Sequence, residues 1–374
     1  MAGKRIILMY ISEISGHHSA TLAIEKAIRG LSCDSEIMNI NAFSYTNPIT
    51  EKIINRLYMS VIKATPQIWD YLYDNPVVVK KLARIKESVH KFNFPKFKAL
   101  FDKFKPDVVC CTQAYPCGMV ADFKKTYKSN IPLVAVLTDY IPHSYWIYDT
   151  VNCYVVPSEQ VGERLVKKGV PSSKVRALGI PFDHKFNDPV NKEKVLEQLG
   201  LAANLPVILI MGGGQGLGPI KEIVKSLEKV RPEFQAIVIT GTNKKLYNSL
   251  KRKIKKFKRK LLVFSYTDRV NEFMTISDLV VTKPGGITTA EALSKKLPMI
   301  IVKPIPGQEA NNTAFLLEQQ AAIRTDDADN INLVFDDLLS SPDKIRKLSE
   351  SAARISKPNA SLDIAKLLLS INNA

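Results

Sequence analysis

A Lys-Pro-Gly-Gly turn lies between an apolar run and a helical pattern in residues 282–294, TKPGGITTAEALS. Gly285 and Gly286 open the turn, and Thr288 and Glu291 follow within the first helical turns. Backbone N–H groups at a helix start bind anions such as a diphosphate, and a nearby carboxylate suits the paired hydroxyls of a ribose. The alternative is plain helix capping by Thr288, with Glu291 complementing the helix dipole.

A second glycine-rich turn follows the apolar run of residues 206–213, in the segment LIMGGGQGLGPIKEIV. Gly213 and Gly214 lie where a ligand's phosphate or sugar oxygens can approach backbone N–H groups. The spacing fits neither the dinucleotide-binding pattern G-x-G-x-x-G nor the Walker A sequence. By itself, this turn indicates binding of a nucleotide or a phosphate group.

The N-terminal half places candidate acid–base residues after two predicted strands. His17 begins a helical pattern in YISEISGHHSATLAI, and Asp139 ends the apolar run before IPHSYW. Strand ends of this kind face the crevice of a doubly wound sheet, where a histidine or carboxylate can act as a general base. His143 and Trp146 are predicted to shape an acceptor pocket. The alternatives are a polar surface role for the histidine and a core position for Trp146.

Two series of short apolar runs must position these residues, and each series alternates with helix-length segments. Such runs indicate parallel sheets buried on both faces, and hence an α/β protein with two doubly wound domains. We predict an N-terminal domain of residues 1–185, a C-terminal domain of residues 186–345, and C-terminal helices in residues 346–374 that break at Lys357-Pro358. The predicted strands are residues 4–11, 36–43, 107–113, 132–139, 152–158 and 175–181, then 206–213, 234–241, 261–267, 278–285 and 298–304.

Composition favours anionic partners. The 374 residues include 53 Lys and Arg against 36 Asp and Glu, a formal net charge of +17. This balance suits nucleic acid, an acidic lipid surface or phosphorylated substrates, although a generally Lys-rich proteome would also produce it. The five cysteines lack metal-ligand spacing, and we expect buried, reduced thiols in a cytosolic protein. No apolar run approaches the length of a membrane span, so we expect any membrane contact to be peripheral.

Basic residues and phenylalanines alternate in residues 77–105, which is typical of a helix lying on an anionic membrane. An ordinary helix packed on its own sheet with a solvated basic face is the competing interpretation. The predicted membrane contacts are Phe94, Lys96, Phe97, Lys98 and Phe101. A second basic run, residues 243–260, lies between two predicted strands and favours a solvated helix face over a binding patch.

These segments together resemble the glycosyltransferase family that contains the monogalactosyl- and glucosyl-diacylglycerol synthases and the peptidoglycan enzyme MurG. The resemblance covers nearly the whole chain and is carried by SGHHSATLAI, TDYIPHSYW, LGIPFDHKF, MGGGQGLG, SYTDRVNEFM, TKPGGITTAEAL and KPIPGQEANN. The last two segments resemble the lipid-glycosylating branch. The resemblance implies a GT-B fold, with two Rossmann-like domains facing a cleft and C-terminal helices that cross back to the N-terminal domain.

The resemblance also implies roles for individual residues. Glu291 is expected to hold the ribose, and Gln308 and Glu309 the sugar hydroxyls. His17 aligns with the family histidine that acts as base or positions the acceptor, and Asp139 is its rival. The remaining donor contacts are expected at Gly213, Gly214, Gly285, Gly286, Ile287 and Thr288 for the phosphates, and at Tyr266 and Thr267 for the uracil.

The resemblance implies transfer of a hexose from UDP-glucose or UDP-galactose to a membrane lipid, with diacylglycerol expected as the acceptor. The anomeric carbon would invert, with no metal or other cofactor and with anionic lipid as a possible activator. The expected location is the cytoplasmic face of a membrane, as a peripheral protein, with no nucleic acid partner. The alternatives are MurG-like transfer to a lipid-linked muramyl acceptor, a UDP-N-acetylglucosamine 2-epimerase, and a non-enzymatic membrane- or nucleic-acid-binding protein.

Overall fold

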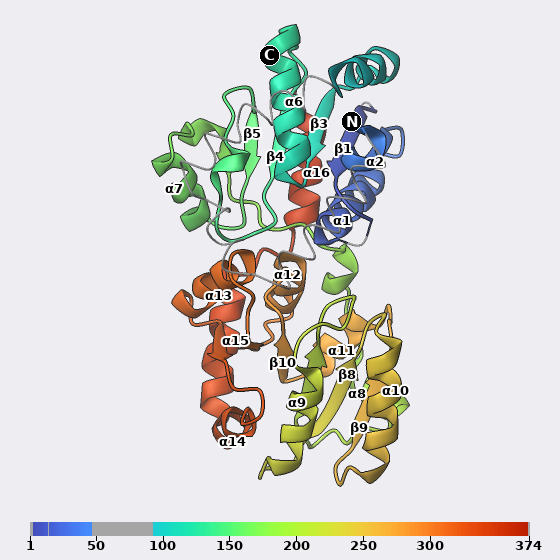
Figure 1. Ribbon diagram of the computed structural model, residues 1–374, viewed down its shortest axis with the longest axis vertical. Helices are drawn as coiled ribbons and strands as arrows, with labels where there is room; N and C mark the ends of the chain where they lie inside the picture. Colours follow the sequence, from blue (N-terminus) through green and yellow to red (C-terminus); the bar gives the residue numbers. More distant parts are fainter. Residues whose placement is uncertain (1–2, 14, 47–92, 373–374) are drawn as a thin grey trace. The chain divides into compact units, whose positions relative to one another are not determined.

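Two six-stranded parallel sheets organise the described part of the chain, which comprises residues 3–13, 15–46 and 93–372 of a computed structural model (Figure 1). Unit 1 comprises residues 1–184, 306–308 and 359–374, and unit 2 comprises residues 185–305 and 309–358. The predicted α/β class with two Rossmann-like domains is confirmed. Most of the predicted membrane segment, residues 77–92, lies outside the described residues.

Unit 1 has the strand order β2-β1-β3-β4-β5-β6, with every neighbouring pair parallel. Because the chain leaves β1 toward one side for β2 and returns on the other side for β3, the topological switch lies between β1 and β3. The strands are β1 (Arg5–Tyr10), β2 (Glu36–Asn41), β3 (Val108–Cys111), β4 (Leu133–Val136), β5 (Cys153–Val155) and β6 (Val175–Arg176). The helices are α1 (Gly16–Leu31), α2 (Ala42–Thr46), residues 93–104, α6 (Ala114–Tyr127), η1 (Ser144–Trp146), α7 (Glu159–Lys167), η2 (Ser172–Lys174) and α16 (Ala360–Ser370).

Unit 2 has the strand order β12-β11-β10-β7-β8-β9, so its switch lies between β7 and β10. The strands are β7 (Val207–Met211), β8 (Gln235–Ile239), β9 (Leu261–Phe264), β10 (Leu279–Thr282), β11 (Met299–Val302) and β12 (Ala322–Thr325). The helices are α8 (Lys192–Leu199), α9 (Ile220–Ser226), η4 (Leu227–Lys229), α10 (Lys244–Lys253), η5 (Ile254–Lys256), α11 (Val270–Ile276), α12 (Gly286–Ser294), α13 (Gln308–Glu318), α14 (Asn332–Leu339) and α15 (Pro342–Ile355), and η3 (His184–Asn187) lies at the unit boundary.

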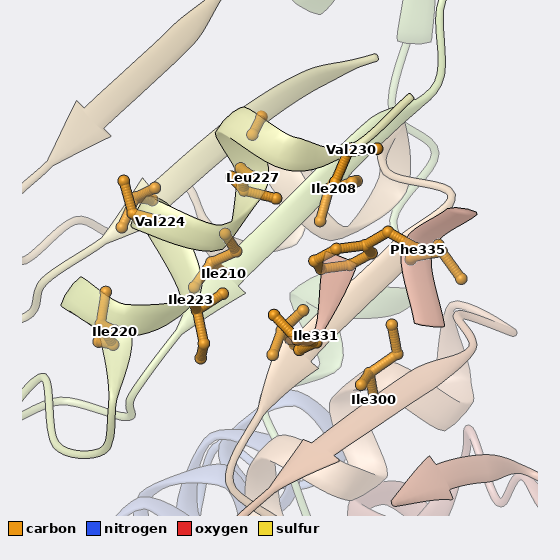
Figure 2. Packing of buried hydrophobic residues seen from close by; sticks show 14 of the residues in the cluster. Ile208, Ile210, Ile220, Ile223, Val224, Leu227, Val230, Ile300, Ile331 and Phe335 are labelled. Atoms are coloured by element: carbon orange, nitrogen blue, oxygen red, sulfur yellow. The ribbon is translucent and has the colours of Figure 1, made fainter. Parts of the chain in front are cut away.

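Each sheet is buried by helices on its faces. In unit 2, Ile220, Ile223 and Val224 of α9 pack on Ile208 and Ile210 of β7 (Figure 2). The central strands are therefore apolar on both sides, as their Val- and Ile-rich runs predicted.

The C-terminal helices separate between the two units. Helix α16 packs beside α1 in the core of unit 1, where Ile364 and Leu368 meet Ile24 and Ile28 (Figure 1). The predicted crossing back to the N-terminal domain is therefore confirmed for α16, while α15 belongs to unit 2. Among the described residues, no helix is both long enough and apolar enough to cross a bilayer.

Candidate active site

His17 lies at the topological switch of unit 1, in the first turn of α1. The Ser15 side chain caps this helix by accepting a hydrogen bond from the His18 backbone N–H (3.2 Å). The His17 ring Nδ1 lies 2.9 Å from the backbone carbonyl oxygen of Thr112, just after β3, and 3.0 Å from Thr138 Oγ1, just after β4. Residues from three strand ends therefore meet at this ring.

The Thr112 contact assigns the tautomer of His17. A carbonyl oxygen can only accept, so the hydrogen of the neutral ring lies on Nδ1 and the lone pair lies on Nε2. Burial lowers the pKa of His17 below its usual value of 6.5, and the nearby Asp139 carboxylate and the Thr112 carbonyl offset part of that shift. A neutral ring with a free lone pair has the chemistry of a general base.

His18 has a different environment from its neighbour. Its ring stacks on Tyr10 with a centroid separation of 4.4 Å, and its Nδ1 lies 3.0 Å from the Glu13 carbonyl oxygen. The Glu13 carboxylate lies 3.4 Å from His18 Nε2 and accepts a hydrogen bond from Tyr10 Oη (2.7 Å). His18 therefore holds the segment before α1, and only His17 lies among the strand ends.

The second predicted base, Asp139, is 8% exposed and lies close enough to His17 to influence its pKa. The structure thus brings together the two residues that the sequence offered as rivals. His143 is half-buried before η1. Trp146 is only 3% exposed, which agrees with its alternative role in the core, and its role in shaping an acceptor pocket stays a prediction.

The glycine-rich loop after β7 folds tightly against the turn after β8. Gly216 has φ +59°, and a Cβ there would lie 2.0 Å from the Thr240 carbonyl oxygen. The Thr242 backbone N–H donates to the Gly214 carbonyl oxygen (2.8 Å), which fixes the two loops together. At Gly213 and Gly214 the space around an added Cβ is open, so a ligand can approach this backbone.

Helix α12 begins at the carboxyl end of β10, on the other side of the switch point. Its N-cap is Gly285, and no side chain caps it, because Thr288 lies inside the helix as its third residue. The alternative of capping by Thr288 is therefore wrong. The first backbone N–H groups of a helix have no partner within it, so Gly286, Ile287 and Thr288 present donors at this end. Glu291 lies about one turn further on and is half-buried.

An ion pair that the sequence did not predict connects the loop after β10 to α13. Lys283 Nζ lies 2.5 Å from Glu309 Oε1, and each side chain is 19% exposed. Glu309 Oε2 accepts a hydrogen bond from the Ile305 backbone N–H (2.9 Å), and Asn312 Nδ2 donates to the Pro284 carbonyl oxygen (2.9 Å). Both carboxylate oxygens of Glu309, which is predicted to bind the sugar hydroxyls, therefore have partners within the protein. Gln308 is the first residue of α13 and is half-buried.

Lys283 also lines a small pocket at the switch point of unit 2. The pocket lies between the carboxyl ends of β7 and β10 and is closed on one side by the glycine-rich loop. Its lining includes Met211, Leu217, Gly218, Pro219, Thr282 and Lys283. The position of Lys283, directly after a strand and before Pro-Gly-Gly, could have marked it in the sequence as a site residue. Its partner Glu309 could not have been identified in the same way, because it is 26 residues away in the sequence.

The predicted uracil contacts lie in the loop after β9. Tyr266 is 64% exposed, and Thr267 is half-buried and accepts a hydrogen bond at Oγ1 from the Arg269 backbone N–H (3.2 Å). β9 is the edge strand beside β8, so this loop lies at the same edge of the sheet as the glycine-rich loop. The roles of both residues in binding uracil stay predictions.

The predicted membrane contact of Phe94, Phe97 and Phe101 is wrong, because all three rings are buried. Phe94 and Phe101 pack edge-on against Phe123 of α6, with centroid separations of 5.8 and 5.1 Å. Burying such a ring stabilises the fold by roughly 1.5–3 kcal/mol, which insertion into lipid would have to offset. The alternative of an ordinary packed helix is correct for residues 93–104, and Lys96 and Lys98 are exposed on its outer face.

Comparison with known proteins assigns the family. Residues 17–182 match the family model for monogalactosyldiacylglycerol (MGDG) synthase, and residues 207–368 match the model for the glycosyltransferase family 28 C-terminal domain. The chain belongs to the monogalactosyl- and glucosyl-diacylglycerol synthase family. This glycosyltransferase is a hexosyltransferase with the GT-B fold.

Relatives match over almost the full length of the glycosyltransferase. A protein of Bacillus licheniformis named processive diacylglycerol beta-glucosyltransferase is 28% identical over 360 residues, covering 96% of this chain and 92% of that protein. A protein of Bacillus cereus with the same name is 29% identical over 373 residues, covering 99% and 94%.

Solved structures share the fold at low identity. MurG of Acinetobacter baumannii has a TM-score of 0.64 at 13% identity and covers 98% of this chain and 100% of that one. HepE of Anabaena in complex with UDP-glucose has a TM-score of 0.56 at 14% identity, with the same coverage. A UDP-GlcNAc 2-epimerase of Neisseria meningitidis bound to UDP-GlcNAc reaches 0.62 at 15% identity, also with that coverage, so the fold alone does not separate transferase from epimerase.

Proposed function

We propose that this glycosyltransferase moves glucose from UDP-glucose to the free hydroxyl of diacylglycerol, with inversion at the anomeric carbon and without a metal. The observation that carries the proposal is the nearly full-length match to two relatives named processive diacylglycerol beta-glucosyltransferase. UDP-galactose is the competing donor, since the matching N-terminal family model is that of MGDG synthase.

The donor is assigned to unit 2, where several groups suit a UDP-sugar. The uncapped N-terminus of α12 offers backbone donors and the positive end of a helix dipole to the diphosphate. The Lys283 ammonium lies at the end of the preceding strand and adds positive charge where a departing diphosphate gains negative charge. Glu291 is assigned to the ribose, and Gln308 and Glu309 to the sugar.

The acceptor is assigned to unit 1, where His17 is the proposed base. His17 Nε2 takes the proton of the diacylglycerol hydroxyl as that oxygen forms a bond to C1 of the sugar. The bond between C1 and the diphosphate oxygen breaks, and UDP leaves with the electron pair. A single displacement by one activated hydroxyl inverts C1, and a neutral histidine suits this step at neutral pH.

The acceptor also implies where the protein works. Diacylglycerol is confined to a bilayer, so we assign the protein to a membrane surface as a peripheral enzyme, on the cytoplasmic face where nucleotide sugars are made. Anionic lipid is the surface that a chain with a net charge of +17 favours.

The proposal is tested with purified protein, diacylglycerol in mixed micelles, and a panel of UDP-glucose, UDP-galactose and UDP-N-acetylglucosamine. Thin-layer chromatography is expected to show a glucolipid, and NMR of its anomeric proton a β linkage. The Glu291→Ala variant is expected to lose both product and the thermal stabilisation by UDP. Absence of lipid product with every donor, or conversion of UDP-N-acetylglucosamine to its 2-epimer, would reject the proposal.

A further inference from the structure

One short segment of unit 2 carries that unit's whole excess of positive charge. Residues 244–260, here called the basic strip, hold ten basic and no acidic residues. Unit 2 has 28 Lys and Arg against 19 Asp and Glu, so outside the strip 18 basic residues face 19 acidic ones. The cations are Lys244, Lys245, Lys251, Arg252, Lys253, Lys255, Lys256, Lys258, Arg259 and Lys260.

The strip lies along one lateral edge of unit 2. It comprises α10, η5 and the residues that lead into β9, the last strand of the sheet (Figure 1). Leu246 and Leu250 of α10 are buried in the core of the unit. Nine of the ten cationic residues are exposed, and Arg259 is half-buried. Lys244 and Lys245 follow the carboxyl end of β8, the edge of the sheet that carries the predicted donor loops, and the other eight cations lie between the last turn of α10 and the start of β9.

Among the described residues, these cations have almost no acidic partners. In the described part of the chain, Arg259 is the strip residue that pairs with a carboxylate, that of Glu233 at 3.5 Å. By contrast, Arg346 of α15 pairs with both Asp343 and Glu350. Like charges at close spacing repel one another, so an external anion that neutralises part of this run stabilises it.

We propose that the basic strip binds the anionic surface of a phospholipid bilayer. Eight of its ten cations are lysines, which suit diffuse attraction to headgroups better than the bidentate geometry that arginine gives to nucleic acid. Its two rings, Tyr247 and Phe257, are half-buried, so the strip offers no exposed platform on which bases could stack. The choice of lipid rests on the proposed function, because diacylglycerol lies in a membrane.

The strip's own rings are half-buried, and the rings predicted to enter the membrane, Phe94, Phe97 and Phe101, are buried. Binding of the strip to a bilayer is therefore expected to depend on charge. Such attraction acts within about one Debye length and is therefore weakened strongly by salt. Binding is expected to require anionic lipid and to be reversible between about 0.05 and about 0.5 M salt.

The test uses the full-length protein and sedimentation with vesicles of phosphatidylcholine alone or mixed with phosphatidylglycerol. One variant replaces Lys251, Lys253, Lys255 and Lys256 by Gln, and a control replaces the exposed Lys192, Lys194, Lys225 and Lys347 of the same unit by Gln. Both variants lose the same net charge. The strip variant is expected to bind anionic vesicles at least about thirtyfold more weakly, and the control to stay within about threefold of the parent.

Equal losses in the two variants would overturn the proposal, because net charge and not the strip would then be responsible. Unchanged vesicle binding, or preference for an oligonucleotide duplex over anionic vesicles, would overturn it as well. Circular dichroism melts check that both variants fold.

Transfer to a short-chain diacylglycerol in neutral detergent micelles is expected to survive in the strip variant. If the parent protein shows no transfer but binds vesicles through the strip, the proposed function is rejected and the proposed membrane-binding role of the strip is upheld.

Discussion

The backbone carbonyl oxygen of Thr112, at the end of β3, lies 2.9 Å from Nδ1 of His17, at the start of α1. Because this oxygen accepts the ring hydrogen, it directs the His17 lone pair to Nε2. The same ring contacts Thr138 and lies near Asp139, so the switch point of unit 1 holds an oriented, neutral histidine.

Replacing His17 is expected to abolish most of the transfer. His17→Asn keeps a donor near the position of Nδ1 but removes the proposed base at Nε2, so kcat is expected to fall by about 10²–10⁴. Binding of UDP, measured by calorimetry, is expected to stay within about threefold of the parent. A variant with nearly full kcat would show that the base lies elsewhere.

The pH dependence of transfer is expected to report the same histidine. As the proposed base, His17 must be neutral to act, and burial lowers its pKa below 6.5, so kcat is expected to fall only as the pH drops below the usual histidine range. The Asp139 carboxylate raises this pKa, so Asp139→Asn is expected to move the acid limb to still lower pH. If the variant instead loses its rate at neutral pH, Asp139 is the base.

The glycine-rich loop offers a stability test with a matched control. Gly216→Ala introduces both strain at φ +59° and a clash with the Thr240 carbonyl, and is expected to lower the free energy of unfolding by about 2–4 kcal/mol. Gly214→Ala has open space and no positive φ, so a change within about 0.5 kcal/mol is expected. Denaturant titration measures both, and similar losses would contradict this account of the loop.

The Lys283–Glu309 pair is expected to act as a unit in donor binding. Lys283→Met leaves a mostly buried carboxylate with one backbone donor, so the affinity for UDP-glucose is expected to fall about tenfold. A double-mutant cycle with Glu309→Gln is expected to give a coupling energy above about 1 kcal/mol. Lys221→Met, at an exposed lysine of α9, is the control. Additive effects in the cycle would show that the two residues act separately.

Local patterns in the sequence predicted most of the fold. Each predicted strand of both series is present, because short Val- and Ile-rich runs between helical segments encode buried parallel strands directly. The strand that was missed, β12, reads AIRT and lies at the edge of its sheet with Arg324 exposed, so it lacks the apolar run of a central strand. The glycine turns and the family motifs also marked the loops that the strand orders place at the two switch points.

What the sequence by itself determined is therefore the local conformation, the α/β class and the segments in which chemistry is possible. Only the tertiary structure decided which of two adjacent histidines lies among the strand ends, and that Glu309 pairs with Lys283. It also decided that the phenylalanines of residues 93–104 pack on α6. The physical reason is that periodicity specifies an apolar face but not what covers it. Contacts such as that of Lys283 with Glu309 join residues whose proximity exists only after the sheet has formed.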